Sequence, residues 1–466
     1  MNQNMQPFRI DKLELRNFRA FSEFTITFHK ELTVLVAPNG GGKTAILDAV
    51  GAAWNLFVDT LNSKPVSRGF DHSDISLFRT KDGTMEPVLP TSFDAEGVVE
   101  GNPVSWSRAL ESDLPNAKTK YRNASELKDS ATRLRERVQL LALGDVQEPP
   151  NLPIICYYGT GRLWGPHKLT KSKLAHNNKN MSRLSGYADC LSSTSRYKFF
   201  VDWFERLSRE VQQEQVTGKP SPHRPGAALD AVRIAVDRLL EPCGWSSIEW
   251  DFAADEIVAN HQAHGRLPVS ILSDGIRNIV GLVADLALRT SRLNPHFGRE
   301  SARLTSGIVL IDEVDMHLHP VWQQLVLPAF RGAFPAVQFI VTTHSPQVLS
   351  TTKAESIRII RSDGHKGVAF KPLEQTEGVE SSYLMALVLG ADPVPPIEIV
   401  RLLSEYRSII QQGLSDSIGA QVLKEKLEAH FGSSHPIILD SQRLIRLEKF
   451  KRENLPLPSQ QPHADK

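Results

Sequence analysis

Near the amino terminus, hydrophobic and polar residues alternate in the way expected for half-buried β-strands. The alternation covers residues 8–15 and 24–28, and a short apolar run at 32–36 is typical of a strand buried on both faces. A glycine-rich turn follows at once, and apolar residues then recur at helical spacing over 46–57. Strand, glycine-rich loop and helix in this order form the local structure of a phosphate-binding loop.

The pattern changes in the middle of the chain. Residues 76–150 predict an insertion that begins with strand-like pieces and continues into a charged amphipathic helix, and residues 151–165 predict a buried strand ending in a turn. From 166 to 245 the pattern is mostly helical, except at 217–225, where proline and glycine exclude a helix interior. No heptad repeat is sustained in this region, so we expect no long coiled-coil arm.

Two further apolar strands are predicted at 307–311 and 337–341, and each ends in a cluster of polar residues. The carboxyl ends of parallel strands lie at one edge of a sheet, where α/β proteins bind their ligands. We therefore expect both clusters to lie near the glycine-rich loop. After about residue 375 the sequence predicts a helical tail with basic side chains near its end.

The composition restricts the possible functions but does not identify one. Of the 466 residues, 41% are hydrophobic and 23% are charged, which allows a sizeable folded core. The 54 Lys and Arg residues balance 53 Asp and Glu residues, so any nucleic-acid contact must come from a local basic patch. The segment 162–186 contains basic residues and no acid, and it is interpreted either as a phosphate-binding strip or as a solvated loop.

The three cysteines, Cys156, Cys190 and Cys243, are far apart and lack CxxC spacing, which argues against a disulfide framework or a structural zinc site. The amino-terminal sequence has no apolar signal region, and no apolar stretch approaches the roughly 18 residues of a membrane span. We therefore expect a cytoplasmic protein without a membrane partner.

Residues 37–44, APNGGGKT, combine the features of a phosphate-binding loop. Glycines let backbone N–H groups turn toward phosphates, Lys43 can reach the β and γ oxygens, and Thr44 can bind Mg²⁺. The strict pattern begins with glycine where this chain has Ala37, which concerns only the first turn. The alternative is a glycine-rich turn that happens to precede Lys-Thr. The predicted ATP-binding residues of the loop are Asn39, Gly40, Gly41, Gly42, Lys43 and Thr44.

The strand at 307–311 ends in two adjacent carboxylates, Asp312 and Glu313. Asp312 would hold Mg²⁺ together with Thr44, and Glu313 would polarise the attacking water as a general base. The alternative is a solvated acidic turn after a buried strand. His344 follows the second apolar strand, where its ring could hydrogen-bond the γ-phosphate, although a histidine there can also be purely structural.

Ser273 and Gly275 lie in the sequence Leu-Ser-Asp-Gly-Ile at the start of a predicted helix. Serine and glycine at a helix N-terminus can contact a phosphate group, and the serine can equally serve as the N-cap. The position of this segment before Asp312 matches the LSGGQ-like signature of ABC ATPases.

With these four motifs in order, the chain resembles ABC-type ATPases of the RecF, SMC and OLD group, and its opening segment is similar to the start of those proteins. The resemblance covers residues 8–75 and 263–350. It implies an ATP contact by Arg19 in the opening segment. It also implies a nucleotide-sandwich dimer, in which Ser273 and Gly275 of one subunit complete the ATP site of another.

A narrower resemblance rests on the segment 156–162, CYYGTGR, and on the tail that begins at residue 378. These look like the PtuA family of ATPases from Septu anti-phage systems and their retron-associated relatives. The resemblance implies an HNH nuclease partner of the PtuB type, with DNA or a retron nucleic acid as a further partner to consider. OLD relatives carry a nuclease after the ATPase, but this tail lacks its acidic cluster, so we expect no nuclease activity from the chain alone.

We therefore predict an α/β protein whose core is an ABC-type P-loop ATPase head with a mostly parallel sheet, helical insertions and no long coiled coil. Its parts are 1–75 with the Walker A loop, 76–262 as the insertion region, 263–375 with the signature, Walker B and H-loop, and 376–466 as the helical C-terminal tail. The predicted activity is hydrolysis of ATP with Mg²⁺. The alternatives are a DNA-repair or chromosome-maintenance ATPase that acts directly on DNA, and a module that binds nucleotide without turnover.

Overall fold

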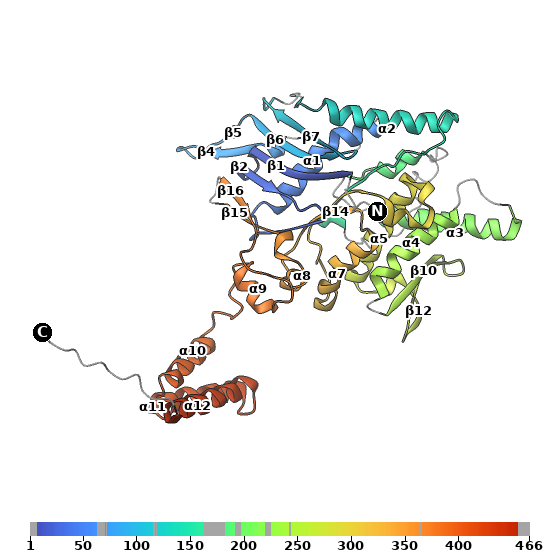
Figure 1. Ribbon diagram of the computed structural model, residues 1–466. Helices are drawn as coiled ribbons and strands as arrows, with labels where there is room; N and C mark the ends of the chain where they lie inside the picture. Colours follow the sequence, from blue (N-terminus) through green and yellow to red (C-terminus); the bar gives the residue numbers. More distant parts are fainter. Residues whose placement is uncertain are drawn as a thin grey trace. The chain divides into compact units, whose positions relative to one another are not determined.

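The computed structural model divides the chain into two compact units, Met1–Gly390 and Ala391–Lys466 (Figure 1). The described residues are 7–62, 70, 72–114, 117, 119–162, 182–191, 197–219, 225–241, 244–362 and 366–454. Most of the basic segment 162–186, and Cys243, lie outside these ranges. No helix among the described residues is long and apolar enough to cross a membrane.

One mixed sheet, of eleven strands in the described ranges, forms the larger unit. Its strands lie in the order β8 (Lys120–Arg122), β7 (Asn102–Leu110), β6 (Thr91–Val99), β1 (Phe8–Phe18), β2 (Phe21–Thr27), β16 (Lys366–Phe370), β15 (Ile357–Ser362), β3 (Leu32–Val36), β14 (Val337–Thr342), β13 (Gly307–Ile311) and β9 (Ile154–Tyr158). The strands from β15 to β9 are parallel. Those from β8 to β2 are antiparallel, and β16 joins the two halves. The predicted fold class is confirmed.

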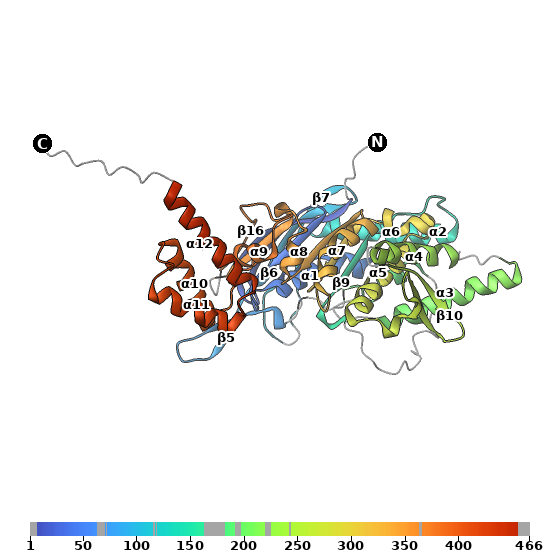
Figure 2. The same ribbon diagram turned by 90° about the horizontal axis from the view of Figure 1, so that it is seen from below.

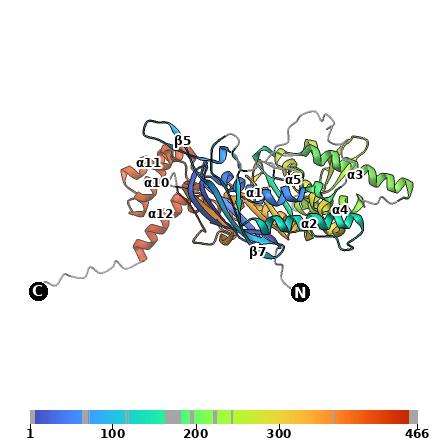
Figure 3. The same ribbon diagram turned by 90° about the horizontal axis from the view of Figure 1, so that it is seen from above.

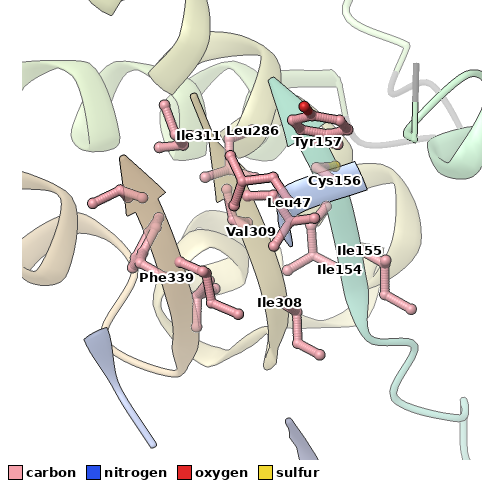
Figure 4. Close-up of a cluster of buried hydrophobic side chains, with 14 of the residues drawn as sticks. Leu47, Ile154, Ile155, Cys156, Tyr157, Leu286, Ile308, Val309, Ile311 and Phe339 are labelled. Carbon is pink, nitrogen blue, oxygen red and sulfur yellow. The ribbon is translucent and has the colours of Figure 1, made fainter. Parts of the chain in front are cut away.

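The two halves of the sheet differ in how their faces are covered. In the parallel half, every residue of β3, β13 and β14 is buried, as the continuous apolar runs predict. In the antiparallel half, β1 alternates between buried and partly exposed positions. Figure 4 shows side chains of β9, β13 and β14 packed together, with Leu47 and Leu286 from two helices against them.

The first of these helices, α1 (Lys43–Asn62), follows the glycine-rich loop and is covered on several sides. A Cβ atom at Gly51 would lie 3.9 Å from the ring of Tyr157 on β9 and 4.0 Å from Leu310 on β13. The ring of Trp54, by contrast, packs edge-on against Trp106 of β7, with 5.4 Å between their centroids. The helix therefore contacts both halves of the sheet, which curls around it.

A buried glutamine closes this curl. β1 and β14 are not neighbours in the sheet, and the pairing of β1 with β2 begins only at Lys12. Gln338 of β14, which is 0% exposed, accepts a hydrogen bond from Ile10 N (2.9 Å) through Oε1. Its Nε2 donates to the carbonyl oxygens of Ile10 (2.8 Å) and His29 (3.0 Å). The side chain thus takes the role of a strand partner for the start of β1.

Helices and two small sheets complete the larger unit. The helices are α2 (Ser125–Leu143), α3 (Tyr197–Thr217), α4 (Pro225–Leu240), α5 (Asp274–Leu293), α6 (Ser301–Leu304), α7 (Pro320–Ala333), α8 (Pro346–Leu349) and α9 (Ser381–Leu387). The small sheets are β4 (Ser76–Arg79) with β5 (Met85–Val88), and β10 (Trp245–Asp251) with β11 (Glu256–His261) and β12 (Gly265–Pro268). α2 packs on α1 (Figure 3), while α4 contacts both α5 and α7 (Figure 2). Four strands of the main sheet, β6, β7, β8 and β9, lie within the region 76–262 that the sequence predicts as an insertion.

Arg183, the last basic residue of the segment 162–186, has structural partners. Its Nε donates to the carbonyl oxygen of Leu293 (2.8 Å), and its Nη2 donates to that of Pro150 (2.6 Å). This guanidinium therefore joins the end of α5 to the residues that precede β9.

The smaller unit consists of α10 (Glu398–Gln411), α11 (Ile418–Phe431) and α12 (Pro436–Asn454), which pack around an apolar core of their own. Basic side chains near its end have local partners. Lys449 pairs with Asp416 (3.3 Å), and Arg452 Nη1 donates to the carbonyl oxygen of Gly413 (3.0 Å). This part of the predicted tail is helical.

Replacing Gln338 with leucine tests whether this side chain closes the sheet. Gln338→Leu leaves buried backbone groups of β1 without partners, at about 1–3 kcal/mol each. We expect the free energy of unfolding to fall by about 2–4 kcal/mol, measured by denaturant titration. Gln324→Leu, at an exposed position of α7, is the control and should change stability by less than about 0.5 kcal/mol. Equal stability of the two variants would contradict this account.

Candidate functional site

The loop 37–44 joins β3 to α1 and depends on two glycines in the left-handed region. Gly40 has φ 76° and Gly42 has φ 86°. A Cβ atom at Gly42 would also lie 2.2 Å from Cζ of Phe21, so no larger residue fits there. At Gly41 a Cβ atom would lie 2.7 Å from Cβ of Ala37, the residue that replaces the usual first glycine. Because Gly41 has no side chain, the methyl group of Ala37 fits beside it.

Lys43 begins α1 and reaches back across this loop. Its Nζ donates to the carbonyl oxygens of Ala37 (3.0 Å) and Pro38 (3.3 Å). Burial lowers the pKa of Lys43, and the negative charges of Asp312 and Glu313 oppose that shift. The ammonium group therefore lies between the loop and the acidic strand end, at a helix N-terminus that favours anions.

The two predicted metal ligands are in direct contact. Thr44 Oγ1 donates to Asp312 Oδ2 at 2.8 Å. Mg²⁺ in nucleotide sites takes one or two protein ligands and completes its shell with phosphate and water oxygens, so this pair fits its chemistry. Among the described residues, no group of three or more His, Cys, Asp or Glu side chains could hold a metal.

Thr342, the last residue of β14, organises both carboxylate residues. Its Oγ1 donates to Asp312 Oδ1 (2.6 Å) and accepts a hydrogen bond from Glu313 N (2.7 Å). The backbone of Glu313 has φ 48°, a conformation that costs a non-glycine residue about 1–3 kcal/mol and is concentrated at functional sites. The sequence predicts a polar cluster here but assigns chemistry only to His344, so Thr342 was missed.

His344 and Asp315 complete the group. Burial, and next the charge of Lys43, lower the pKa of His344, so the ring is neutral near pH 7. Asp315 opposes this shift and accepts a hydrogen bond from Thr343 Oγ1 (2.6 Å). Asp315 is also missing from the sequence prediction of the site, although its place in the run Asp-Glu-Val-Asp is a usable signal.

The signature residues lie at the start of α5, and the structure gives them different surroundings. Ser273 is exposed at the N-cap position, and its side chain makes no capping hydrogen bond. Gly275 is buried, and a Cβ atom there would lie 2.3 Å from the carbonyl oxygen of His317. Gly275 therefore packs on the loop that follows Asp312 and Glu313 in the same chain.

Arg19, in the turn between β1 and β2, bridges two carboxylates. Its Nη1 pairs with Asp48 of α1 (2.6 Å), and its Nη2 pairs with the buried Asp74 (2.9 Å). Burial of the guanidinium acts to lower the pKa of Arg19, but the charges of Asp48 and Asp74 outweigh it and raise the pKa. This bridge connects the turn between β1 and β2 to α1. An ATP contact by Arg19 stays a prediction.

Comparison with known proteins finds relatives over most of the chain. Residues 12–217 match a family described as AAA domain, and residues 252–350 match one described as AAA domain, putative AbiEii toxin, Type IV TA system. The retron Ec83 probable ATPase of Escherichia coli is 24% identical over 95% of this chain and 87% of its own length. The retron Vc95 probable ATPase of Vibrio cholerae serotype O1 biovar El Tor is 23% identical over 92% of this chain and 88% of its own length. Septu protein PtuA of Bacillus thuringiensis is 22% identical over 94% of this chain and 97% of its own length.

The chain is a homologue of the retron ATPases and of Septu PtuA. The AAA-domain matches and the retron probable ATPases support its resemblance to ABC-type ATPases of the RecF- and SMC-like group, which the order of its motifs predicts. A solved SMC head bound to the C-winged helix domain of ScpA is 16% identical over 78% of this chain and 98% of its own, with a TM-score of 0.45. The SMC head domain from Thermotoga maritima is 18% identical over 78% of this chain and 99% of its own, with a TM-score of 0.42.

Substituting Thr342 tests its role at the carboxylates. Thr342→Val removes the hydroxyl that bonds both Asp312 and Glu313 while keeping the shape of the side chain. Outer partners of this kind typically contribute about 10- to 100-fold to activity, so we expect kcat for ATP hydrolysis to fall by that factor. Thr342→Ser keeps the hydroxyl and should retain most of the rate. A valine variant with the kcat of the unmodified protein would rule out this role.

Proposed function

We propose that this protein binds ATP with Mg²⁺ between the loop 37–44 and Asp312, and hydrolyses it. The direct hydrogen bond between Thr44 and Asp312 carries the proposal, because it joins the phosphate loop to the acidic strand end as a nucleotide site requires. Lys43 precedes Thr44 at the start of α1, Glu313 follows Asp312 in the chain, and the charges of Lys43, Asp312 and Glu313 all act on the pKa of His344.

Each residue of this group has a role that its chemistry allows. Lys43 neutralises the β and γ oxygens, and Glu313 orients and polarises the attacking water. His344, whose neutral ring can donate one hydrogen bond, contacts the γ-phosphate. Mg²⁺, held by Thr44 and Asp312, would neutralise charge that develops on the phosphate oxygens.

We further propose that ATP closes the site between two copies of the chain. Ser273 supports this, because a serine that is exposed at a helix N-terminus and makes no capping bond is available to a phosphate on another subunit. Gly275 then lets α5 approach the loop at His317 closely enough to present Ser273. The dimer would act as a switch that ATP closes and hydrolysis opens.

The homologues support a role in anti-phage defence. Relatives named for retrons and for Septu each match more than nine-tenths of this chain. We propose that the ATP switch controls a separate effector in the cytoplasm, an HNH nuclease of the PtuB type, and that the chain alone cleaves no nucleic acid. Purification of the native complex followed by mass spectrometry tests this. An HNH nuclease should co-purify, whereas DNA without a nuclease would favour direct action on DNA.

Lys43→Ala tests nucleotide binding. The variant loses charge-assisted hydrogen bonds to the phosphates, each worth about 1.5–3 kcal/mol, so we expect the affinity for ATP to fall about 100-fold or more. Isothermal titration calorimetry measures the change. Lys371→Ala, an exposed lysine on the same unit, should bind ATP as tightly as the unmodified protein. Unchanged ATP affinity of Lys43→Ala would refute the proposed site.

Glu313→Gln tests the general base and the switch together. The amide cannot take a proton from water, so kcat should fall about 100-fold or more while ATP still binds. Bound ATP should then persist and increase the dimer fraction in sedimentation or light-scattering measurements. Glu377→Gln, at an exposed site, is the matched control. Normal hydrolysis by Glu313→Gln would show that another group is the base.

A further inference from the structure

Strand β9 carries two successive tyrosines, which the nucleotide site does not use. Successive side chains of a strand point to opposite faces, so Tyr157 and Tyr158 contact different helices. Tyr157 lies against α1 at Gly51, and burial, followed by the charges of Asp48 and Asp312, raises the pKa of Tyr157. Tyr158 Oη donates to Asp285 Oδ2 of α5 at 2.8 Å. The strand thus connects the helix that follows the phosphate loop to the helix that begins at the signature.

The connection to α5 is held by a buried ion pair. Asp285 is 7% exposed and Arg289, one turn later, is 5% exposed. Arg289 Nε donates to the same carboxylate oxygen, Asp285 Oδ2, at 2.8 Å. The other oxygen, Oδ1, is buried and has no hydrogen-bond partner among the described residues. Tyr158 and Arg289 therefore share one acceptor in a low-dielectric setting, where removing either donor is costly.

The same tyrosine also contacts the acidic strand end through its main chain. The carbonyl oxygen of Tyr158 accepts a hydrogen bond from Asp312 N at 2.8 Å, and Tyr158 pairs with Ile311 in the parallel ladder. One residue therefore binds α5 with its side chain and Asp312 with its backbone.

We propose that Tyr158 is a positioning residue for ATP hydrolysis, which couples the position of the signature helix α5 to the backbone of Asp312 and Glu313. This rests on the proposed function of the site. A shift of α5, such as a phosphate contact at Ser273 would produce, moves Asp285 and with it the end of β9. Asp312 and Glu313 then adopt the geometry needed for hydrolysis only when α5 lies where Ser273 contacts a phosphate. Tyr158 touches neither nucleotide nor reacting atoms, and it acts through Asp312.

Tyr158→Phe removes one oxygen and keeps the ring. We expect kcat to fall about 3- to 30-fold, as coupling residues commonly do, while KM and ATP affinity change less than about twofold because the loop 37–44 is untouched. Tyr187→Phe is the matched control. Its hydroxyl is also buried and donates to the carbonyl oxygen of Pro153 (2.6 Å), just before the same strand. This control should lose similar thermal stability but keep kcat.

A double variant separates coupling from mere weakening. If α5 acts on Asp312 through Tyr158, the effects of Ser273→Ala and Tyr158→Phe on kcat overlap, and the double variant is little slower than the slower single variant. The effects of Ser273→Ala and Tyr187→Phe should instead multiply. Multiplying effects for the Tyr158 pair, or a kcat for Tyr158→Phe equal to that of the unmodified protein, would overturn the proposal.

Hydrogen exchange gives a readout that does not need ATP hydrolysis. Tyr158→Phe should speed exchange of amides in residues 307–316 relative to Tyr187→Phe, because the acceptor of Asp312 N is no longer anchored to α5. If the unmodified protein does not hydrolyse ATP, the proposed function is refuted. Hydrogen exchange would still test whether Tyr158 links α5 to Asp312. Equal exchange in the two variants would overturn the link even in an active ATPase.

Discussion

The parallel arrangement of β3, β14 and β13 is the constraint on which the site depends. Adjacent strands lie about 4.8 Å apart, so residues beyond their carboxyl ends come within hydrogen-bonding reach whatever their separation in sequence. Thr44, Thr342 and Asp312 meet in this way, with two hydrogen bonds to one carboxylate. Burial of α1 inside the curl of the sheet fixes the direction from which the loop approaches them.

The sequence predicts those parts of the site whose chemistry is local. Lys43 lies in a glycine-rich turn between a strand and a helix, and Asp312 and Glu313 end an apolar run, so each could be found without knowing its neighbours. Thr342 could not be found this way. A threonine hydroxyl gains its role only from the strand beside it, and hydrophobic periodicity does not encode strand order.

The same limit applies to the fold. Alternation predicts strands in the region 76–150, but it does not reveal that β6 pairs with β1 and extends the main sheet. Gln338 looks like one polar residue in an apolar run, and its burial is explained only by the curl that brings Ile10 beside it. Tyr158 is similar, since its partner Asp285 lies on a helix far along the chain. Long-range contacts of this kind follow from topology.

Ser273 and Gly275 differ in their surroundings, and this difference determines which of them can test a contact with another subunit. Gly275 is constrained within its own chain, because any side chain there would collide with the carbonyl oxygen of His317. Substituting Gly275 would therefore disturb the loop beyond Glu313 even in a lone subunit. Ser273 has no such constraint, since it is exposed and does not cap α5 with its side chain. A loss of function at Ser273 with the fold intact would therefore support the proposed contact with a phosphate of another subunit, whereas a loss at Gly275 would not distinguish that contact from a disturbed loop.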